Sequence, residues 1–283
     1  MLSFFLADKL FINEILNQPR YKINHFCAKK LIIEYAIKQS NYVLFVKFFN
    51  NSSAEWLKSN AFHFLYLSAK YKQFNCSTNI ISLIDVNALF ENNFSSLVKL
   101  IEISKDDIFF LNNDERIHYL IHKNIYSILI ESLDLNASHS LKFFFENFSY
   151  DIDRLTQSQK AYIINKSFKI NKFEFLNYII TNNSYFFISS FKEWILDALM
   201  LLDYHKKEES FLIKKSHISK QTFILKLFSN HEIMDQLDIL LSNDPSYFCA
   251  INNDNLFFEN LIQKANNIYM QSRKKSPSRL AFI

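Results

Sequence analysis

Residues 191–202 read FKEWILDALMLL, and their apolar side chains recur at the spacing of an α-helix. The apolar positions are spaced i, i+3, i+4, i+7, i+8 and i+11, which places them on one helix face. They are Phe191, Trp194, Ile195, Ala198, Leu199 and Leu202. Ser190, with Glu193 three residues later, forms a capping-box pattern at the start of this stretch. The stretch therefore predicts an amphipathic helix with a buried apolar face.

The same signals recur elsewhere in the chain. Capping-box patterns also occur at Ser52 with Glu55 and at Thr156 with Gln159. Strict alternation of apolar and polar residues is scarce, although the many isoleucines and aromatic residues would suit β-strands. We therefore expect an all-α fold.

Glycine is absent from the 283 residues, and only three prolines are present. Glycine-rich phosphate loops, dinucleotide-binding fingerprints and nucleophile elbows all need glycine, so these kinds of site are excluded. Asparagine is the residue that next best tolerates the left-handed conformation at the end of a helix. We therefore expect helices to end at Asn-Asn pairs. These pairs lie at 50–51, 92–93, 112–113, 182–183, 252–253 and 266–267.

Four segments share one plan, in which a lead asparagine is followed by an apolar helix that closes on another asparagine. The lead residues are Asn41, Asn124, Asn171 and Asn230, and their intervals of 83, 47 and 59 residues follow no fixed period. The expected architecture is an irregular repeat of antiparallel helix pairs, an α-solenoid.

These segments resemble the helix-turn-helix half of ankyrin repeats over residues 24–245, and a tetratricopeptide-like stack of helix pairs fits equally well. The C-terminal segment is basic and ends in Leu280-Ala281-Phe282-Ile283. In this it is similar to effectors that intracellular bacteria export by type IV secretion, whose signals commonly lie at the C-terminus. These resemblances imply a degenerate helical-repeat protein that binds other proteins, with a host cell as one place of action.

The net charge is confined to the C-terminal segment 271–283. Its four basic residues account for the whole formal charge of +4, whereas residues 1–270 balance 28 basic against 28 acidic side chains. The body of the protein therefore has no net field that would attract nucleic acid. We expect one elongated domain over 1–270, with a lobe boundary near 204–220 as an alternative, and a flexible basic tail over 271–283.

Membrane insertion is not indicated by the sequence. The uncharged stretch 175–191 is interrupted by Thr181-Asn182-Asn183-Ser184, so it is a poor match to a membrane span of about 20 apolar residues. We therefore expect no membrane span and a cytoplasmic protein, located in the host cytosol if it is secreted.

One row of side chains is a candidate for metal binding. Asp114, His118 and His122 are four residues apart in turn, which would place them on one face of a helix. Neighbouring apolar residues supply the buried face of that helix, so an exposed polar face is the expected role, and we expect no cofactor or metal.

Nucleophilic catalysis has no candidate either. The three cysteines are too far apart for a zinc or disulfide pattern, and we expect them to be buried free thiols. They are Cys27, Cys76 and Cys249. We therefore expect no catalytic residue and no enzyme activity.

The remaining hypothesis is binding of another protein along a groove with an exposed aromatic rim. The aromatic candidates are Trp56, Trp194, Phe143 and Phe144. The basic candidates are Lys206, Lys207, Lys214 and Lys215. The predicted function is a non-catalytic protein-protein interaction module, more specifically a secreted bacterial effector or a regulator of another effector. The alternative is a helical repeat that binds RNA or DNA, with its aromatic side chains stacking on bases.

Overall fold

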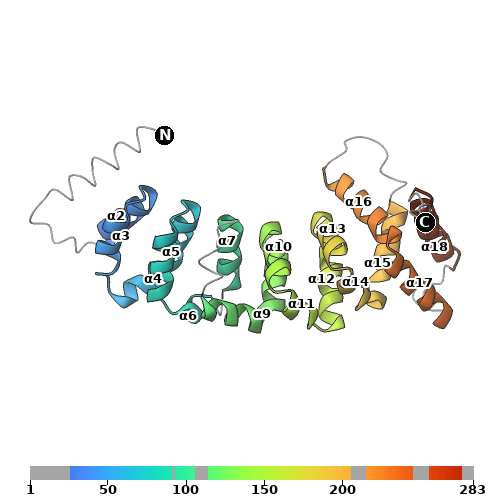
Figure 1. Cartoon of the computed structure of the whole chain (residues 1–283), viewed down its shortest axis with the longest axis horizontal. Helices are drawn as coiled ribbons and strands as arrows, with labels where there is room; N and C mark the ends of the chain where they lie inside the picture. The colour runs from blue at the N-terminus through green and yellow to red at the C-terminus, as the bar shows by residue number, and fades with distance from the viewer. Residues whose placement is uncertain (1–25, 91–92, 106–113, 205–214, 245–254, 276–283) are drawn as a thin grey trace, which may run out of the picture. The chain divides into compact units, whose positions relative to one another are not determined.

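The computed structural model describes residues 26–90, 93–105, 114–204, 215–244 and 255–275, and it confirms the all-α prediction (Figure 1). Within these ranges the chain forms sixteen helices and no β-strand. The helices are α2 (Phe26–Lys38), α3 (Tyr42–Phe49), α4 (Ala54–Lys70), α5 (Phe74–Leu83), α6 (Val86–Phe90), α7 (Phe94–Ser104), α9 (Glu115–Asp134), α10 (Ser138–Asn147), α11 (Ser149–Asp153), α12 (Gln157–Lys169), α13 (Phe173–Asn182), α14 (Ser184–Ile188), α15 (Phe191–Tyr204), α16 (Lys215–Ser229), α17 (His231–Asn243) and α18 (Asn255–Lys275). None of these helices combines the length and the apolar character needed to cross a membrane.

The chain divides into two compact units, Met1–Ser140 and Leu141–Ile283, and the division falls in the first turn of α10. This division does not coincide with the alternative boundary predicted near 204–220. Residues 205–214 are outside the described part of the chain. The tail predicted over 271–283 is helical up to Lys275, where α18 ends. Residues 276–283 lie outside the described residues.

Four pairs of consecutive helices are joined in the same way: α2 with α3, α4 with α5, α9 with α10, and α12 with α13. One residue with φ between 56° and 58° stands at each joint, namely Ser40, Lys72, Asn136 and Asn171. The N–H of the next residue donates to the carbonyl five residues earlier, over 2.7 to 2.9 Å. This bond and the positive φ define a Schellman motif. Each joint therefore turns the chain directly from one helix into the next.

The left-handed residues recur at a nearly constant interval. The four joints are 32, 64 and 35 residues apart, and Lys105, with φ of 49° after α7, divides the middle interval into 33 and 31. Helices α3 and α13 do end at the Asn-Asn pairs 50–51 and 182–183, as predicted, but these pairs do not adopt the left-handed conformation, and the pair 266–267 ends no helix. Asn50 ends α3 in the right-handed region, Asn183 has φ of −150°, and the pair 266–267 lies inside α18.

Equivalent positions around the four joints are also buried alike. The residues eight, seven and four before each joint, and the residue five after it, all have no exposed surface. The first two are large and apolar in every pair, and the third is always small. The third position holds Ala36, Ser68, Ser132 and Ser167. A small side chain at a buried helix position allows a neighbouring helix to approach closely, which explains why no large residue stands there.

Within the first unit, α4 packs against α2, α5 and α7, and α7 packs against α9. Aromatic rings fill the space between the first helices. Phe45 stacks on Phe49 at 4.8 Å between ring centroids, and Phe64 lies between Phe49 and Trp56 at 6.1 and 5.6 Å. Such ring pairs add to the stability that comes from burial of apolar area.

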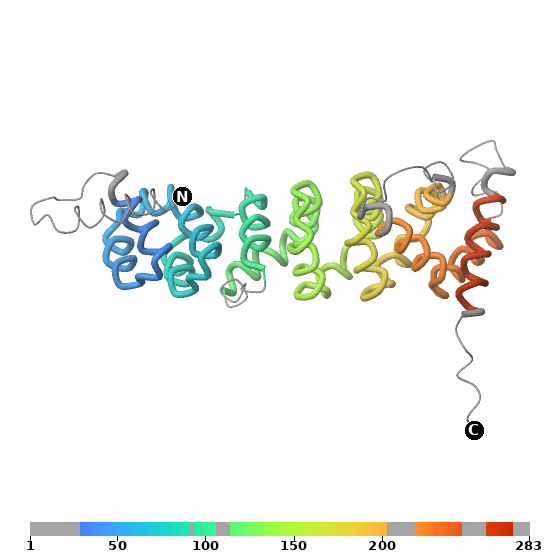
Figure 2. The backbone as a smooth tube through the Cα atoms, turned by 90° about the horizontal axis from the view of Figure 1, so that it is seen from above, coloured from blue at the N-terminus to red at the C-terminus, as the bar shows by residue number. Residues whose placement is uncertain are grey.

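Within the second unit, α12 packs against α13 and α15, and α16 packs against α13 and α18. In both views the helices of this unit run side by side (Figures 1 and 2). Its core centres on Phe187, whose ring lies 5.2 Å from Trp194 and 6.1 Å from Phe223. The helix predicted at 191–202 is confirmed as α15, with its apolar face in this core.

Two of the predicted capping boxes can be judged from their hydrogen bonds. The box at Thr156 is confirmed, because its hydroxyl accepts from the Gln159 N–H while the Gln159 side chain accepts from the Thr156 N–H. The box at Ser52 is wrong. The Ser52 hydroxyl donates to the Phe48 carbonyl, and α4 starts one residue later with Ser53 as its N-cap.

Candidate functional site

The four aromatic residues predicted to form a binding rim are core residues. Trp194 and Phe144 have no exposed surface, and Trp56 and Phe143 are 8% and 6% exposed. The Trp194 indole N–H donates to the Phe187 carbonyl at 2.8 Å, so even its polar atom is satisfied inside the protein. These side chains are buried because neighbouring helices cover them, and the expected exposed rim is therefore not formed by these residues.

The structure does not position the predicted basic side chains. Lys206, Lys207 and Lys214 lie outside the described residues. Lys215 is the first residue of α16, but its side chain is also outside the described part. Their proposed role in binding a partner remains a prediction.

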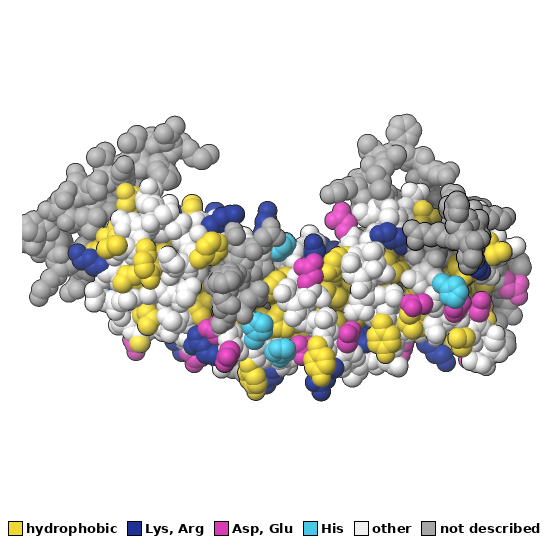
Figure 3. Space-filling model, in the orientation of Figure 1, with side chains coloured by type: hydrophobic (Ala, Val, Ile, Leu, Met, Phe, Trp, Pro, Cys, Tyr) yellow, Lys and Arg dark blue, Asp and Glu magenta, His cyan; other side chains and the backbone are white. Residues whose placement is uncertain are grey.

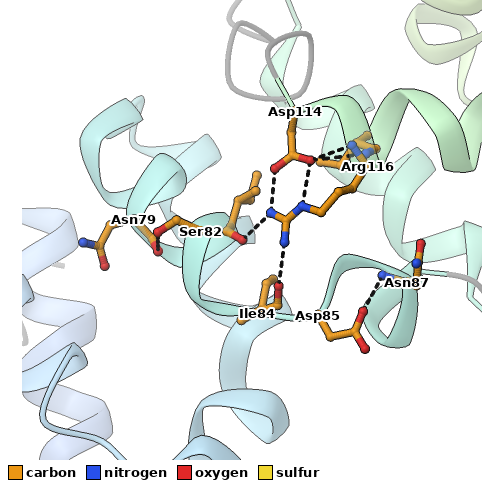
Figure 4. Close-up of polar contacts among 9 residues, drawn as sticks. Asn79, Ser82, Ile84, Asp85, Asn87, Asp114 and Arg116 are labelled. Atoms are coloured by element: carbon orange, nitrogen blue, oxygen red, sulfur yellow. Dashed lines mark hydrogen bonds and ion pairs between the residues drawn. The ribbon is translucent and has the colours of Figure 1, made fainter.

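The row Asp114, His118 and His122 does not act as one cluster, because Asp114 is used at the start of α9 (Figure 4). Its carboxylate accepts from the Arg116 N–H at 3.0 Å and from the Arg116 guanidinium at 2.7 and 3.1 Å. The same guanidinium donates to the carbonyls of Ile81 and Ile84 at the end of α5, at 2.9 and 3.3 Å.

This arrangement is a structural link between α5 and α9. The hydrogen bond from Arg116 holds the pKa of Asp114 below its ordinary value, and burial opposes this effect. Within the described residues, no three His, Cys, Asp or Glu side chains are close enough together to hold a metal ion.

Cys76 is a buried free thiol, as predicted. Burial raises its pKa to about 12, so the thiol stays protonated and unreactive at neutral pH. The side chains of Cys27 and Cys249 lie outside the described part of the chain.

Among the large hydrophobic side chains that are exposed in the described residues, tyrosine is the most frequent type, and the sequence analysis did not select these tyrosines. Tyr150, Tyr185 and Tyr162 of the second unit are 69%, 60% and 51% exposed. On the face drawn in Figure 3, exposed hydrophobic side chains stand in separate small patches among polar atoms. Tyrosine suits such positions because its ring packs on neighbours while its hydroxyl stays in water.

Tyr185 stands on α14, and a buried lysine fixes this short helix to its neighbours. The Lys160 ammonium group donates to the Asp153 carbonyl at 2.9 Å and lies 5.3 Å from the Tyr185 ring and 5.8 Å from the Phe186 ring. Burial lowers the pKa of Lys160, and the charge of Asp153 opposes that shift. Asn183 caps α14 and also donates to the Asp153 carboxylate at 3.2 Å. The position of Tyr185 is thus set by α11 and α12.

At the C-terminal end of α14 lies a cavity of about 310 Å³, bounded by the end of α14, the starts of α12 and α15, and one side of α17. We call it the α14–α17 groove. Its lining includes Ile188, Ser189, Phe191, Gln236, Ile239 and Leu240. Phe191 and Leu240 form a buried floor, whereas Ile239 is 50% exposed at the rim. Ser184 donates to the Glu232 carboxylate at 2.9 Å, which ties the start of α14 to the start of α17.

Tyr185 and the groove belong to one surface, because Ile188 and Ser189 follow Tyr185 by three and four residues on a helix. The groove lining contains no cysteine and no histidine. The lining combines the buried apolar residues Phe191 and Leu240 with polar and charged residues.

Acidic side chains occur on α17 and in the first turn of α15, and of these only Glu193 is on the groove lining, together with Lys192. Helix α17 contains Glu232, Asp235 and Asp238 and no lysine or arginine. Asp235 pairs with His231 at 2.7 Å. Glu193, on the groove lining, and Asp238 are both exposed, and neither carboxylate has a hydrogen bond or ion pair with another described residue.

The chain matches no protein-family model, and it has no significant match among the curated proteins or solved structures compared with it. The fold therefore defines a class, an all-α protein built from consecutive helix pairs, and no family is assigned to it.

Proposed function

We propose that this chain is a non-catalytic protein-binding module, and that the α14–α17 groove with Tyr185 is a binding surface for its partner. The observation that carries the proposal is a cavity of about 310 Å³ whose apolar lining residues include the half-exposed Ile239, with Tyr185, 60% exposed, one helical turn before Ile188 of the lining. Exposed apolar and aromatic side chains around a pocket on rigid helices are typical anchors of protein interfaces.

The helix pairs support the finer proposal of a degenerate α-solenoid. The residues with positive φ, four of them at the shared joints and the fifth Lys105 after α7, recur every 31 to 35 residues, which is close to the length of one ankyrin or tetratricopeptide repeat. In such arrays, buried positions hold the stack together and the remaining surface is free to bind a partner. Action as a secreted effector, or as a regulator of another effector, belongs to this proposal and rests on the C-terminal resemblance.

The test is an affinity purification with three baits: the wild-type chain, Ile239→Glu, and Leu225→Glu as the matched control. Leu225 is 54% exposed on α16, outside the groove, so it matches the 50% exposure of Ile239. We expect one protein to be recovered in fixed ratio with the wild type and the control and to be lost with Ile239→Glu. Recovery by all three baits would refute the groove as the binding surface. Recovery of nuclease-sensitive RNA or DNA in place of a protein would favour the nucleic-acid alternative.

A further inference from the structure

We infer that residues 3–17, which lie outside the described part of the chain, cover the outer side of α2 and α3 as part of a further helix pair. The inference goes beyond the proposed function and does not depend on it, because it concerns the first unit. It combines the exposure of side chains on α2 and α3 with the order of apolar residues in the sequence 3–17.

The outer side of α3 is the side that carries Leu44 and Phe48. These residues stand four and eight positions after the joint at Ser40, and both are partly exposed. In the three other joined pairs the same two positions are buried, with at most 5% of each residue exposed. They hold Cys76 and Ile80 in α5, Ser140 and Phe144 in α10, and Phe175 and Ile179 in α13. Among the described residues, the first pair therefore lacks a cover that the other pairs have.

In the other pairs, the helices that come before them supply this cover. Helix α5 packs against α3. Ser140 of α10 donates its hydroxyl to the Val98 carbonyl of α7 at 3.0 Å. The Phe175 ring of α13 lies 5.3 Å from the Phe145 ring of α10. Ser140 and Phe175 are each the fourth residue after a joint, so this position faces the helix that precedes the pair.

The first helices of the pairs show the same direction. His63 of α4 stands nine residues before its joint, and its ring contacts the Glu34 carboxylate of α2 at 2.8 Å. The equivalent residue of α2 is Leu31, which is apolar and 46% exposed. In helical-repeat arrays the outer face of a terminal repeat is normally polar. The apolar outer side of α2 and α3 is therefore a surface that further helical residues are expected to cover.

The sequence 3–17 repeats the pattern of the described pairs. Counted from Ala7, which lies 33 residues before Ser40, apolar residues stand four, five, eight and nine positions later. They are Phe11, Ile12, Ile15 and Leu16. The same positions of α13 hold Phe175, Leu176, Ile179 and Ile180, which are all buried. Ser3 falls at the small position four residues before Ala7, and the interval of 33 lies within the 31 to 35 residues that separate the described residues of positive φ. Residues 3–17 thus carry the apolar side chains that a preceding helix pair would place on α2 and α3.

Hydrogen exchange of the full-length chain, followed by mass spectrometry, tests the inference. We expect the amides of residues 11–16 to exchange at least about tenfold more slowly than in a synthetic peptide of residues 1–20, because packed helical amides are protected. Ile15→Asp should abolish this protection and speed exchange in α3. Leu10→Asp is the matched control and should keep the protection, because its equivalents in the described pairs include Val43, which is 81% exposed, and the exposed Glu174.

A thiol probe on α3 reports the cover from the other side. Leu44→Cys should be labelled at least about tenfold faster in combination with Ile15→Asp than alone, because the cover is then lost. Thr78→Cys, exposed on α5, is the control and should react equally in both backgrounds. Peptide mass mapping separates these positions from the native cysteines. If Ile15→Asp lowers the helix content measured by circular dichroism, Ile15→Ala takes its place.

Two results would overturn the inference directly: unprotected amides at residues 11–16 in the wild type, or equal exchange of this segment in the two aspartate variants. Sedimentation at two protein concentrations identifies the other occupant of this face, a second copy of the chain. If protection appears only as a dimer forms, the face is an interface between copies and the inference is wrong. None of these results bears on the α14–α17 groove, which the affinity purification tests separately.

Discussion

Glycine at a helix joint should stabilise this glycine-free protein relative to alanine, and the reverse should hold inside a helix. Lys72 stands at the joint of α4 and α5 with φ of 57°. Lys58 is an exposed residue inside α4 and serves as the matched control. Replacing each lysine with glycine and with alanine removes the same side chain in both variants, so their difference isolates the backbone conformation.

The expected magnitude follows from the two backbone states. A left-handed residue with a Cβ destabilises the folded state by roughly 1–2 kcal/mol, and glycine avoids this cost. Glycine also lowers stability by about 0.4–1 kcal/mol, because it increases the entropy of the unfolded chain. Glycine should therefore be more stable than alanine at position 72 by about 1 kcal/mol. At position 58 glycine should be less stable by about 1 kcal/mol. The two comparisons thus differ by about 2 kcal/mol with opposite signs.

Urea unfolding followed by circular dichroism measures both differences, and thermal unfolding should show midpoint shifts of a few degrees in opposite directions. The Gln73 N–H bond to the Ser68 carbonyl, 2.7 Å long, should be protected from hydrogen exchange in both variants. The reasoning is refuted if alanine equals or exceeds glycine at position 72, because the joint would then not be left-handed. The same order is expected at Ser40, Asn136 and Asn171.

Three further changes test other features of the structure. Asp114→Ala should lower the free energy of unfolding by about 1 kcal/mol at pH 7 and by less at pH 3. Because Arg116 lowers the pKa of this carboxyl in the folded protein, its stabilising effect is present above the unfolded pKa of about 4 and is lost as the pH falls through the folded pKa. Urea titrations at both pH values measure this difference. Cys76, with its pKa raised to about 12, should not react with a thiol reagent at pH 8 until urea unfolds the chain. Labelling of Cys76 in the native protein, detected by peptide mass mapping, would contradict its burial. Ser132→Leu should destabilise by about 1–3 kcal/mol through overpacking, whereas Ser127→Leu on the exposed side of α9 should stay within about 0.5 kcal/mol; equal unfolding midpoints for the two would contradict the close packing around Ser132.

Helices were predictable because their signals are local. The apolar spacing of residues 191–202 depends only on near neighbours, and it correctly predicts α15. The capping boxes show the limit of this reading. Thr156 and Gln159 bond as expected, but the Ser52 hydroxyl has a competing acceptor in the Phe48 carbonyl. Serine can cap a helix or bond back to it, and only the backbone geometry decides between the two.

The regular interval was missed because asparagine has two roles in this chain. Asn41 and Asn230 accept hydrogen bonds as N-caps, whereas Asn136 and Asn171 adopt the left-handed conformation. Spacings measured between asparagines therefore mix helix starts with helix ends. Ser40 and Lys72 fill the same joint without any asparagine, so no residue type marks it consistently.

The better signal was the buried pattern before each joint, in which two large apolar residues are followed three positions later by a small one. It reads Ile32-Ile33 with Ala36, Phe64-Leu65 with Ser68, Ile128-Leu129 with Ser132, and Ile163-Ile164 with Ser167. A serine in this place looks polar and exposed in the sequence. Its burial depends on a neighbouring helix that packs against it, which is a tertiary property.

The candidate site could not be predicted because it forms between helices that are separated in the sequence. Phenylalanine and tryptophan residues were predicted to bind a partner because of their size, but these side chains are buried in the cores of the two units. Ile188 of α14 and Ile239 of α17 line one groove, and Tyr185 stands one helical turn before Ile188. Local pairs four residues apart, such as Tyr150 with Arg154 at 5.4 Å and Tyr162 with Lys166 at 5.9 Å, lie outside the groove lining.

The same packing explains why the binding surface is proposed at α14 and α17 and not on the paired helices. Four positions at each joint are fully buried: those eight, seven and four residues before it and five after it. Substitutions at these positions therefore destabilise the fold. Helix α14 follows the pair of α12 and α13 and leaves Tyr185 exposed, while Lys160 and Asn183 hold it in place. A short helix that is fixed by its neighbours but not needed to fill the core can vary its outer side chains without loss of the fold. Recognition is therefore expected to reside on the connecting helices, with the helix pairs as the rigid support.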